Sequence, residues 1–275
     1  MFASIIVFTV AISVAFFRGD FSFAKEVSDV DALTGQRIGV MTAYESDYLL
    51  SDRSDITLKR YDSEADLMVA LCYKQVDAIS YIKEYGKYIL KRTKGFEMVD
   101  GSLAQTGYAL IYDKVRQQEL ADEFNEWLAV FMESDRYDEY CRKIDNIDFY
   151  DGSPITEETG TGKMIAVAYI YDYVPIVFAD AKTGLPNGYE TEIIRLFAND
   201  MNYKIEWVET TDSIVWNLLL AGKVDLYLGG YSELYRSEMD SSEYYGMSDN
   251  YYVTDIVLMK VSDYDNISLI DILED

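Results

Sequence analysis

The sequence contains no histidine and only two cysteines and three prolines among its 275 residues. Without histidine, the Ser-His-Asp and Cys-His arrangements of nucleophilic catalysis are excluded, and so is every zinc site that needs an imidazole ligand. Positive charge is scarce as well, because 24 Lys and Arg residues stand against 49 Asp and Glu, a formal net charge of −25. Such a chain repels a phosphate backbone, so we expect no nucleic-acid partner.

The two cysteines are too few for a disulfide framework. Cys72 falls within an apolar helical pattern and Cys141 closes a separate helix. Because disulfide geometry is strict, we expect two unlinked thiols.

Apolar residues make up 49% of the chain and charged residues 27%, a composition typical of a folded globular protein. Aromatic residues reach 15%, and 25 of them are tyrosine. A tyrosine offers a flat apolar face and a hydroxyl at low entropic cost, which suits recognition of a small molecule or a protein. The alternative interpretation is that the tyrosines fill half-exposed structural positions.

The N-terminal segment is apolar and uncharged from Phe2 to Phe17, and Ser22-Phe23-Ala24 follows Arg18. This pattern predicts an export signal or an N-terminal anchor over residues 1–24. The run is short for a bilayer span, which needs about 20 residues, but it lacks the usual positive n-region, so cleavage and anchoring both stay open. We therefore expect an exported protein, periplasmic or at the cell surface.

Two stretches of the chain alternate strand and helix patterns. The first, from Arg37 to Thr93, reads β-α-β-α-β, and the second, from Ile165 to Leu228, repeats the plan. Val76-Asp77-Ala78 of the first stretch is echoed by Val224-Asp225-Leu226 of the second. The sequence predicts an α/β protein of two lobes, each with a mainly parallel sheet flanked by helices.

A helical region from Leu120 to Lys143 and an acidic linker from Asp145 to Lys163 separate the two stretches. Gly160-Thr161-Gly162-Lys163 is not a phosphate-binding P-loop, because Glu157 and Met164 occupy places that need glycine and a hydroxyl residue. The linker aspartates lack EF-hand spacing. We expect no cofactor and no metal.

Five motifs of the second stretch resemble, in register, those of the first lobe of family 3 extracellular solute-binding proteins. They are Tyr173-Val174-Pro175-Ile176, Gly188-Tyr189-Glu190, Gly222-Lys223-Val224-Asp225-Leu226, the turn from Ser232 to Arg236, and Ser248-Asp249-Asn250-Tyr251-Tyr252. The earlier stretch resembles the second lobe of the same family through Leu33-Thr34-Gly35-Gln36-Arg37-Ile38-Gly39-Val40, Val76-Asp77-Ala78 and Gly107-Tyr108-Ala109-Leu110, and Phe124-Asn125-Glu126-Trp127-Leu128 resembles its closing helix.

The lobe order is reversed relative to the usual family chain, so the sequence is either a circularly permuted receptor or a segment of a longer tandem or fused protein. The resemblance divides the chain into a second-lobe-like domain at 33–109, the return strand and closing helices at 110–150, a linker at 151–163, a first-lobe-like domain at 164–261 and a tail at 262–275. It also predicts that 104–112 and 253–260 lie side by side as the two crossings between the lobes.

The resemblance implies a type II periplasmic-binding-protein architecture that captures a small polar solute, an amino acid or a related carboxylate, for a membrane permease of the ABC type. We expect a monomer without enzyme activity. A ligand-sensing module of a signalling protein is the alternative, and a dehydratase on the same fold is a further one, weakened by the lack of histidine and of a close acid pair.

Arg236 is the expected clamp for a solute carboxylate, because its guanidinium matches a carboxylate bidentately. Ile82 stands where the family has the acid that binds a solute ammonium. Ala43-Tyr44 stands where the family has the Gly-Thr that begins a helix. These two departures put the solute class in doubt. Glu84 and Tyr81 are the two candidates to take the place of the missing acid. The ligand-binding residues implied by the resemblance are Arg236, Ser232, Tyr231, Gly230, Tyr171, Asp172 and Tyr173 of lobe one and Thr42, Tyr44 and Tyr81 of lobe two.

Overall fold

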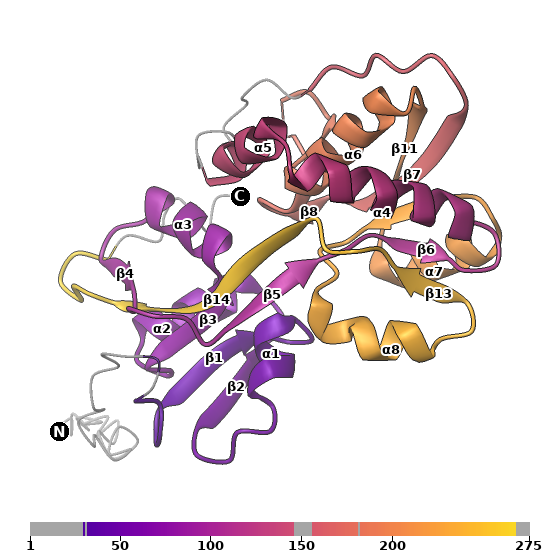
Figure 1. Ribbon diagram of the computed structural model, residues 1–275. Helices are drawn as coiled ribbons and strands as arrows, with labels where there is room; N and C mark the ends of the chain where they lie inside the picture. Colours follow the sequence, from indigo (N-terminus) through magenta and orange to yellow (C-terminus); the bar gives the residue numbers. More distant parts are fainter. Residues whose placement is uncertain (1–29, 31, 146–155, 181, 268–275) are drawn as a thin grey trace, which may run out of the picture.

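The computed structural model describes residues 30, 32–145, 156–180 and 182–267, which form two α/β lobes (Figure 1). Lobe two is built on the sheet that contains the first strand of the chain, and lobe one on the sheet formed mainly by residues after 163. The predicted signal or anchor at 1–24 lies outside the described residues. Among the described helices, none combines the length and apolarity needed to cross a membrane.

Lobe two has a sheet of strand order β2-β1-β3-β14-β4, with β5 also paired to β14. Strands β1, β2 and β3 are parallel, as the β-α-β-α-β pattern predicts, whereas β14 runs antiparallel to β3. The strands are β1 (Arg37–Met41), β2 (Thr57–Tyr61), β3 (Ala78–Ile82), β4 (Phe96–Met98), β5 (Ala104–Tyr108) and β14 (Tyr252–Val261), and the helices are α1 (Glu45–Leu50), α2 (Glu64–Cys72) and α3 (Lys83–Arg92).

Lobe one has a sheet of strand order β11-β7-β12-β6-β13, in which β7, β11 and β12 are parallel. A small sheet of order β10-β9-β8 lies beside it. The strands are β6 (Ile111–Asp113), β7 (Met164–Ile170), β8 (Asp172–Tyr173), β9 (Val177–Ala179), β10 (Pro186–Asn187), β11 (Lys204–Thr210), β12 (Leu226–Leu228) and β13 (Tyr245–Met247), and the helices are α6 (Tyr189–Asp200), α7 (Asp212–Leu220), η3 (Glu233–Tyr235) and α8 (Arg236–Ser241).

The helical region between the lobes forms α4 (Gln118–Met132) and α5 (Asp135–Asp145), which lie over lobe one in Figure 1. The apolar face of α4 is buried, and its Phe124 ring meets the edge of Phe197 from α6 at 5.2 Å between ring centroids. Burial of such aromatic rings dominates core energetics, so the closing helices are part of the core of lobe one rather than a separate unit.

The two crossings between the lobes lie side by side, as the sequence predicts. Strand β5 pairs with β14 in lobe two, where Gly107 faces Val253, and β6 pairs with β13 in lobe one, where Tyr112 faces Gly246. The crossing strands thus pass from one sheet into the other along both segments (Figure 1). Because β14 completes the sheet of lobe two, the spatial boundary of lobe one lies before Tyr252.

The repeated Val-Asp motif has the same structural role in both lobes. Asp77 accepts a hydrogen bond from the backbone N–H of Arg37 at 2.8 Å and donates its own N–H to the Arg37 carbonyl. Asp225 makes the equivalent pair of bonds with Ala166, also at 2.8 Å for the carboxylate. Each aspartate therefore fixes the register of its strand against the first strand of the lobe, which confirms that the echo reflects two similar lobes.

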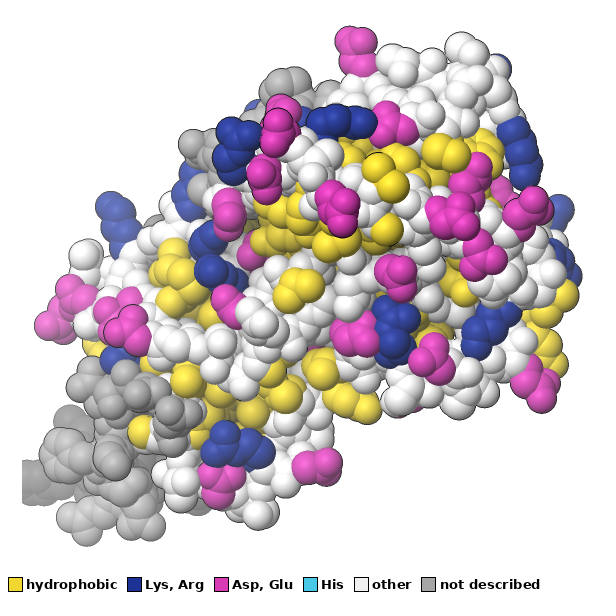
Figure 2. All heavy atoms as spheres, viewed as in Figure 1, with side chains coloured by type: hydrophobic (Ala, Val, Ile, Leu, Met, Phe, Trp, Pro, Cys, Tyr) yellow, Lys and Arg dark blue, Asp and Glu magenta, His cyan; other side chains and the backbone are white. Residues whose placement is uncertain are grey.

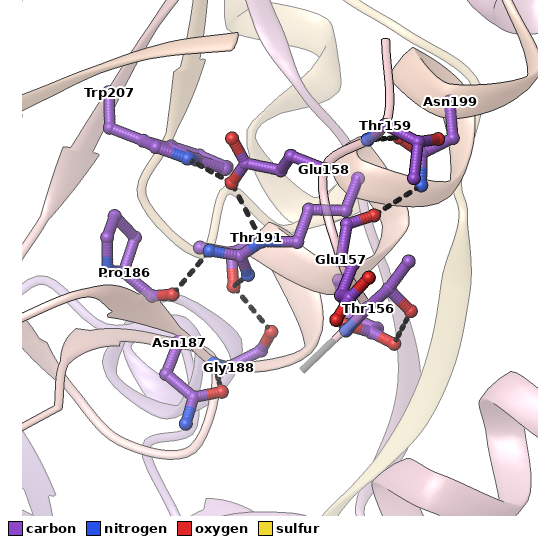
Figure 3. Close-up of polar contacts among 12 residues, drawn as sticks. Thr156, Glu157, Glu158, Thr159, Pro186, Asn187, Gly188, Thr191, Asn199 and Trp207 are labelled. Carbon is purple, nitrogen blue, oxygen red and sulfur yellow. Dashed lines mark hydrogen bonds and ion pairs between the residues drawn. The ribbon is translucent and has the colours of Figure 1, made fainter. Parts of the chain in front are cut away.

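The described part of the linker packs on lobe one (Figure 3). Glu158 accepts bonds from the guanidinium of buried Arg195 at 3.1 Å and from the indole N–H of Trp207 at 2.8 Å. Arg195 also donates to the Pro186 carbonyl and to the Thr191 hydroxyl. A buried guanidinium needs such partners, so this cluster fixes the entry of the linker into lobe one.

Both cysteines are free, as predicted, and each is partly buried. Acidic and basic side chains are interspersed over the face shown in Figure 2, and no continuous basic surface is visible there. This face therefore gives no support to an interaction with nucleic acid.

Candidate functional site

A small hollow lies where the carboxyl ends of β1 and β3 meet lobe one, with a cavity volume of ≈ 20 Å³, which is room for about one water molecule. Tyr44, Tyr81 and Tyr85 of lobe two and Tyr173 of lobe one form aromatic walls. In α/β sheets, ligands bind at the carboxyl ends of the strands, so the position of this hollow is that of a ligand site.

The polar groups of the hollow come from the start of α1 and from β3. Glu45 is only 4% exposed, and its carboxylate accepts bonds from the Tyr108 hydroxyl at 3.0 Å and the Tyr173 hydroxyl at 3.4 Å. Ser80 donates to the Ser46 hydroxyl at 2.8 Å. Burial raises the pKa of the Glu45 carboxyl, although hydrogen bonds to its own backbone N–H and to the two tyrosines favour the charged form.

The hydroxyl of Tyr81 is buried, in a residue that lines the hollow, and it has no hydrogen-bond partner among the described residues. Its ring packs against that of Tyr85 at 4.6 Å between centroids. Burial, and next the negative charge of Glu64, raise the pKa of the Tyr81 hydroxyl well above its usual range. Because a buried hydroxyl without a partner is costly, the wall offers an unused polar group to whatever enters.

The mouth of the hollow is closed by direct contacts between the lobes. The Tyr44 ring stacks on the Tyr173 ring at 5.2 Å between centroids, and the Tyr235 hydroxyl of lobe one donates to the Ala43 carbonyl at 2.8 Å. Ala43 has φ +62°, an uncommon conformation for a residue with a side chain. The strained residue precedes Tyr44 and Glu45, so it directs both toward lobe one.

A second buried carboxylate lies in lobe one, at the start of α6. Glu190 is fully buried, accepts a bond from the Gly230 backbone N–H at 3.0 Å and accepts another from the Tyr251 hydroxyl. Burial raises the pKa of Glu190 to about 8; its hydrogen bonds lower the value and the charge of Glu45 adds to it. The two acids therefore face the same interface from opposite lobes.

Glu84, at the start of α3, is the third buried carboxylate of this region and lies outside the hollow. It accepts bonds from the Tyr252 hydroxyl at 2.9 Å and from the Thr254 hydroxyl. The nearby Tyr189 hydroxyl is fully buried and unpartnered, like that of Tyr81, but does not line the hollow. Glu84 is thus fixed by the β14 crossing.

Three of the residues implied by the resemblance, Tyr44, Tyr81 and Tyr173, line the hollow together. Gly230 lies against the Tyr173 ring, which a Cβ at that position would overlap. The backbone of Asp172 lies in β8, paired with Phe178.

The remaining implied residues do not line the hollow. Arg236 donates to Glu233 at 2.6 Å, to the Ser248 carbonyl at 2.8 Å and to Asn250 at 3.2 Å. Its role as a carboxylate clamp stays a prediction. The others are engaged or exposed: Ser232 bonds Thr106, Thr42 bonds Asp62, Tyr231 packs on Trp216, and Tyr171 is 47% exposed.

The sequence interpretation missed Glu45, Ser46, Ser80, Met41 and Tyr85, while Ile82, where an acid was expected, lines the hollow as an apolar wall. The position of Glu45 in the sequence could have indicated it, because Glu45 is the first residue of the helix that follows the first strand of lobe two. No group of three or more acidic or cysteine side chains suited to a metal ion occurs among the described residues. The candidate site combines one carboxyl group with hydroxyls and aromatic rings.

Comparison with solved structures finds distant likenesses. They include a ligand-binding component of an ABC-type import system from Staphylococcus aureus (TM-score 0.42, 13% identity, 83% of this chain and 66% of that chain) and the probable amino-acid ABC transporter extracellular-binding protein ytmK from Bacillus subtilis (TM-score 0.41, 10% identity, 84% and 88%). A third is the VFT2 domain of BvgS from Bordetella pertussis (TM-score 0.40, 9% identity, 82% and 79%).

Comparison with curated proteins finds no match. A family model matches the chain, and the match covers most of lobe one together with strand β14. This is the part of the chain that contains the five motifs described above. Residues 165–267 match the family model of bacterial extracellular solute-binding proteins, family 3.

Proposed function

We propose that this protein is an extracytoplasmic solute-binding protein whose lobes close on a small polar solute at the hollow around Glu45. The observation that carries the proposal is that aromatic walls from both lobes enclose one buried carboxylate, in a molecule whose lobes are joined by two crossing segments. Paired crossings allow hinge motion, and a solute that touches both lobes favours the closed arrangement.

The groups available in the hollow support binding rather than catalysis. Glu45 is the single acid among the residues that line it, so the described wall offers no acid-base pair. The family match supports a place outside the cytoplasmic membrane. Delivery of the solute to an ABC-type permease by a monomeric receptor is the finer part of this proposal.

The test measures binding and closure together. The chain is screened against small solutes by thermal shift, since a ligand that binds only the native state raises the midpoint. Closure is followed by the distance between spin labels on Ser54→Cys in lobe two and Lys223→Cys in lobe one, in a background with Cys72 and Cys141 replaced by alanine. A solute that binds should shorten the distance.

Tyr173→Ala should weaken binding of any such solute by roughly tenfold, because it removes the wall contributed by lobe one. Tyr244→Ala is the matched control, since Tyr244 is an exposed tyrosine of lobe one outside the hollow. Equal effects of the two substitutions, or binding without any change in the label distance, would contradict the proposal.

A further inference from the structure

The acid of the hollow, Glu45, has no positive partner among the described lining residues, and its burial raises the pKa of its carboxyl group. Glu45 is the charged residue among the described lining residues, and no Lys or Arg lines the hollow. Its carboxyl oxygens accept hydrogen bonds from two tyrosine hydroxyls. These bonds use the acceptor capacity of the oxygens but bring no positive charge. Burying an ionised carboxylate without a cation is unfavourable, so a positively charged solute would offset that cost.

The Tyr81 hydroxyl provides an independent observation. It is buried in the same wall and has no hydrogen-bond partner, although its oxygen can accept a proton donor. Tyr81 and Glu45 line the same hollow, so an ammonium group that enters it has a hydroxyl acceptor and a carboxyl group in the wall. A neutral apolar solute would leave both unsatisfied.

The aromatic rings suit the same ligand. Tyr44, Tyr81, Tyr85 and Tyr173 surround the hollow, and the Tyr44–Tyr173 stack spans the two lobes. A cation near the faces of such rings is attracted by their quadrupoles, which is how aromatic cages bind substituted ammonium groups. Because one wall belongs to lobe one, the cage is complete only in the closed arrangement.

The expected carboxylate anchor, by contrast, is engaged elsewhere. Arg236 is paired with Glu233 and with the Ser248 carbonyl, and it does not line the hollow. A solute carboxylate in the hollow would face Glu45 without a positive group beside it. The wall therefore disfavours both simple carboxylates and zwitterionic α-amino acids.

We propose that the solute is a small alkylammonium cation without a carboxylate, held by Glu45, the Tyr81 hydroxyl and the four tyrosine rings. This inference rests on the proposed function, because it names the class of solute for the same hollow. The ammonium group lies against Glu45 and the alkyl part against the rings and the Ile82 side chain.

The first test uses methylammonium and tetramethylammonium chloride as probes, with tert-butanol as a neutral probe of similar shape and sodium acetate as an anionic one, all at constant ionic strength. The ammonium probes should raise the unfolding midpoint and shorten the label distance, whereas tert-butanol and acetate should not. Methylammonium offers a positive charge with N–H donors, whereas tetramethylammonium offers the charge and methyl groups without an N–H donor.

Glu45→Gln should weaken both ammonium probes by roughly tenfold or more, because a bond to a charged partner is lost. Glu84→Gln is the matched control, since Glu84 is equally buried but lies outside the hollow. Tyr81→Phe deletes only the unpartnered hydroxyl, so it keeps the test valid if Glu45→Gln does not fold. It should weaken methylammonium several-fold and spare tetramethylammonium, while its control, Tyr189→Phe, should leave both unchanged.

The outcomes separate this inference from the proposed function. Closure on acetate or glycine that depends on Arg236, shown by its loss in Arg236→Ala, would overturn the alkylammonium inference and keep the solute-binding function. Ammonium binding that is equally weakened by Tyr81→Phe and Tyr189→Phe would place the probe outside the hollow and overturn the inference. Absence of binding by every solute and probe would contradict both.

Discussion

The two lobes share a plan of parallel strands and antiparallel crossings, yet they bury charge differently. In lobe one, the buried carboxylate of Glu192 has a Lys143 ammonium at 3.1 Å, and buried Arg195 has Glu158 at the same distance. In lobe two, Glu45 and Glu84 are bonded to tyrosine and threonine hydroxyls instead. Lobe two also pairs Asp47 with Arg60 at 2.8 Å, and lobe one also buries Glu190 against the Tyr251 hydroxyl and the Gly230 N–H. The contrast therefore lies between single acids: an ion pair holds Glu192, whereas hydroxyl groups hold Glu45 and Glu84.

The lobes also differ in how much each depends on the other's chain segments. The sheet of lobe one is complete before Tyr252, whereas lobe two takes its strand β14 from the far end of the described chain. Strand β14 pairs with β3, β4 and β5. Lobe two consequently cannot complete its sheet from its own contiguous residues, and this dependence can be tested directly.

The largest effect is expected from a chain that ends at Tyr251. Loss of β14 leaves β3, β4 and β5 without their shared partner, so lobe two should fail to fold while lobe one keeps its five-stranded sheet. Hydrogen exchange should show lost protection in β1 and β3 and retained protection in β7 and β11. A chain that ends at Ile267 keeps β14 and is the control; equal protection in both chains would show that the lobes fold independently.

The next largest effect concerns the start of α6 in lobe one. Gly188 has φ +107° and ψ +168°, a region that only glycine adopts readily, and a Cβ there would overlap the Ile176 carbonyl oxygen. Gly188→Ala should therefore cost about 3 kcal/mol of unfolding free energy, measured by urea titration. The equivalent N-cap position of α1 in lobe two is Tyr44, whose φ is −90°, so the demand for glycine distinguishes the two helix starts.

Gly184→Ala is the control for this substitution. Gly184 also has a positive φ, +68°, but no atom lies within 4 Å of a Cβ built there. Its replacement should cost only about 1 kcal/mol, the strain of a left-handed alanine. If the two substitutions had equal effects, the close approach to Ile176 would not be what requires Gly188.

Periodicity predicted the fold well because burial in each element repeats locally. The strand at Lys204–Thr210 and the helix at Asp212–Leu220 occur where their patterns indicated, and the crossing strands pair as expected. The site was less predictable because its contacts are not local. Glu45 resembles a solvated helix-start acid in the sequence, and it becomes buried only when Tyr173, 128 positions later, covers it.

Arg236 illustrates the opposite limit of sequence reasoning. The fork of an arginine matches a carboxylate, but Glu233, three positions earlier, already supplies one at 2.6 Å. A pair at this spacing can form within one turn without any information from the rest of the fold. Local pairing therefore competes with a site role, and the sequence alone gives no measure of which interaction prevails.

The effect that is small per pH unit in this comparison is a dependence of stability on pH that both lobes share. Burial raises the pKa of Glu190 from 4.5 to about 8, and it raises that of Glu45 as well. Between about pH 4.5 and pH 8 the native state retains a proton on Glu190 that the unfolded state has lost. The free energy of unfolding should therefore fall as pH rises through this window, by at most about 1.4 kcal/mol per pH unit for one group.

Glu190→Gln should remove roughly 1 kcal/mol per pH unit of this slope, as measured by urea unfolding at a series of pH values. Some slope should remain from Glu45, and adding Glu45→Gln should reduce it further if the two acids act from opposite lobes. Glu206→Gln is the control, because Glu206 is an exposed acid of lobe one and its removal changes the net charge equally. An equal flattening of the dependence of unfolding free energy on pH by Glu206→Gln and by Glu190→Gln would contradict this expectation. That result would attribute the pH dependence to general charge repulsion in this acidic chain and not to the buried carboxyl groups.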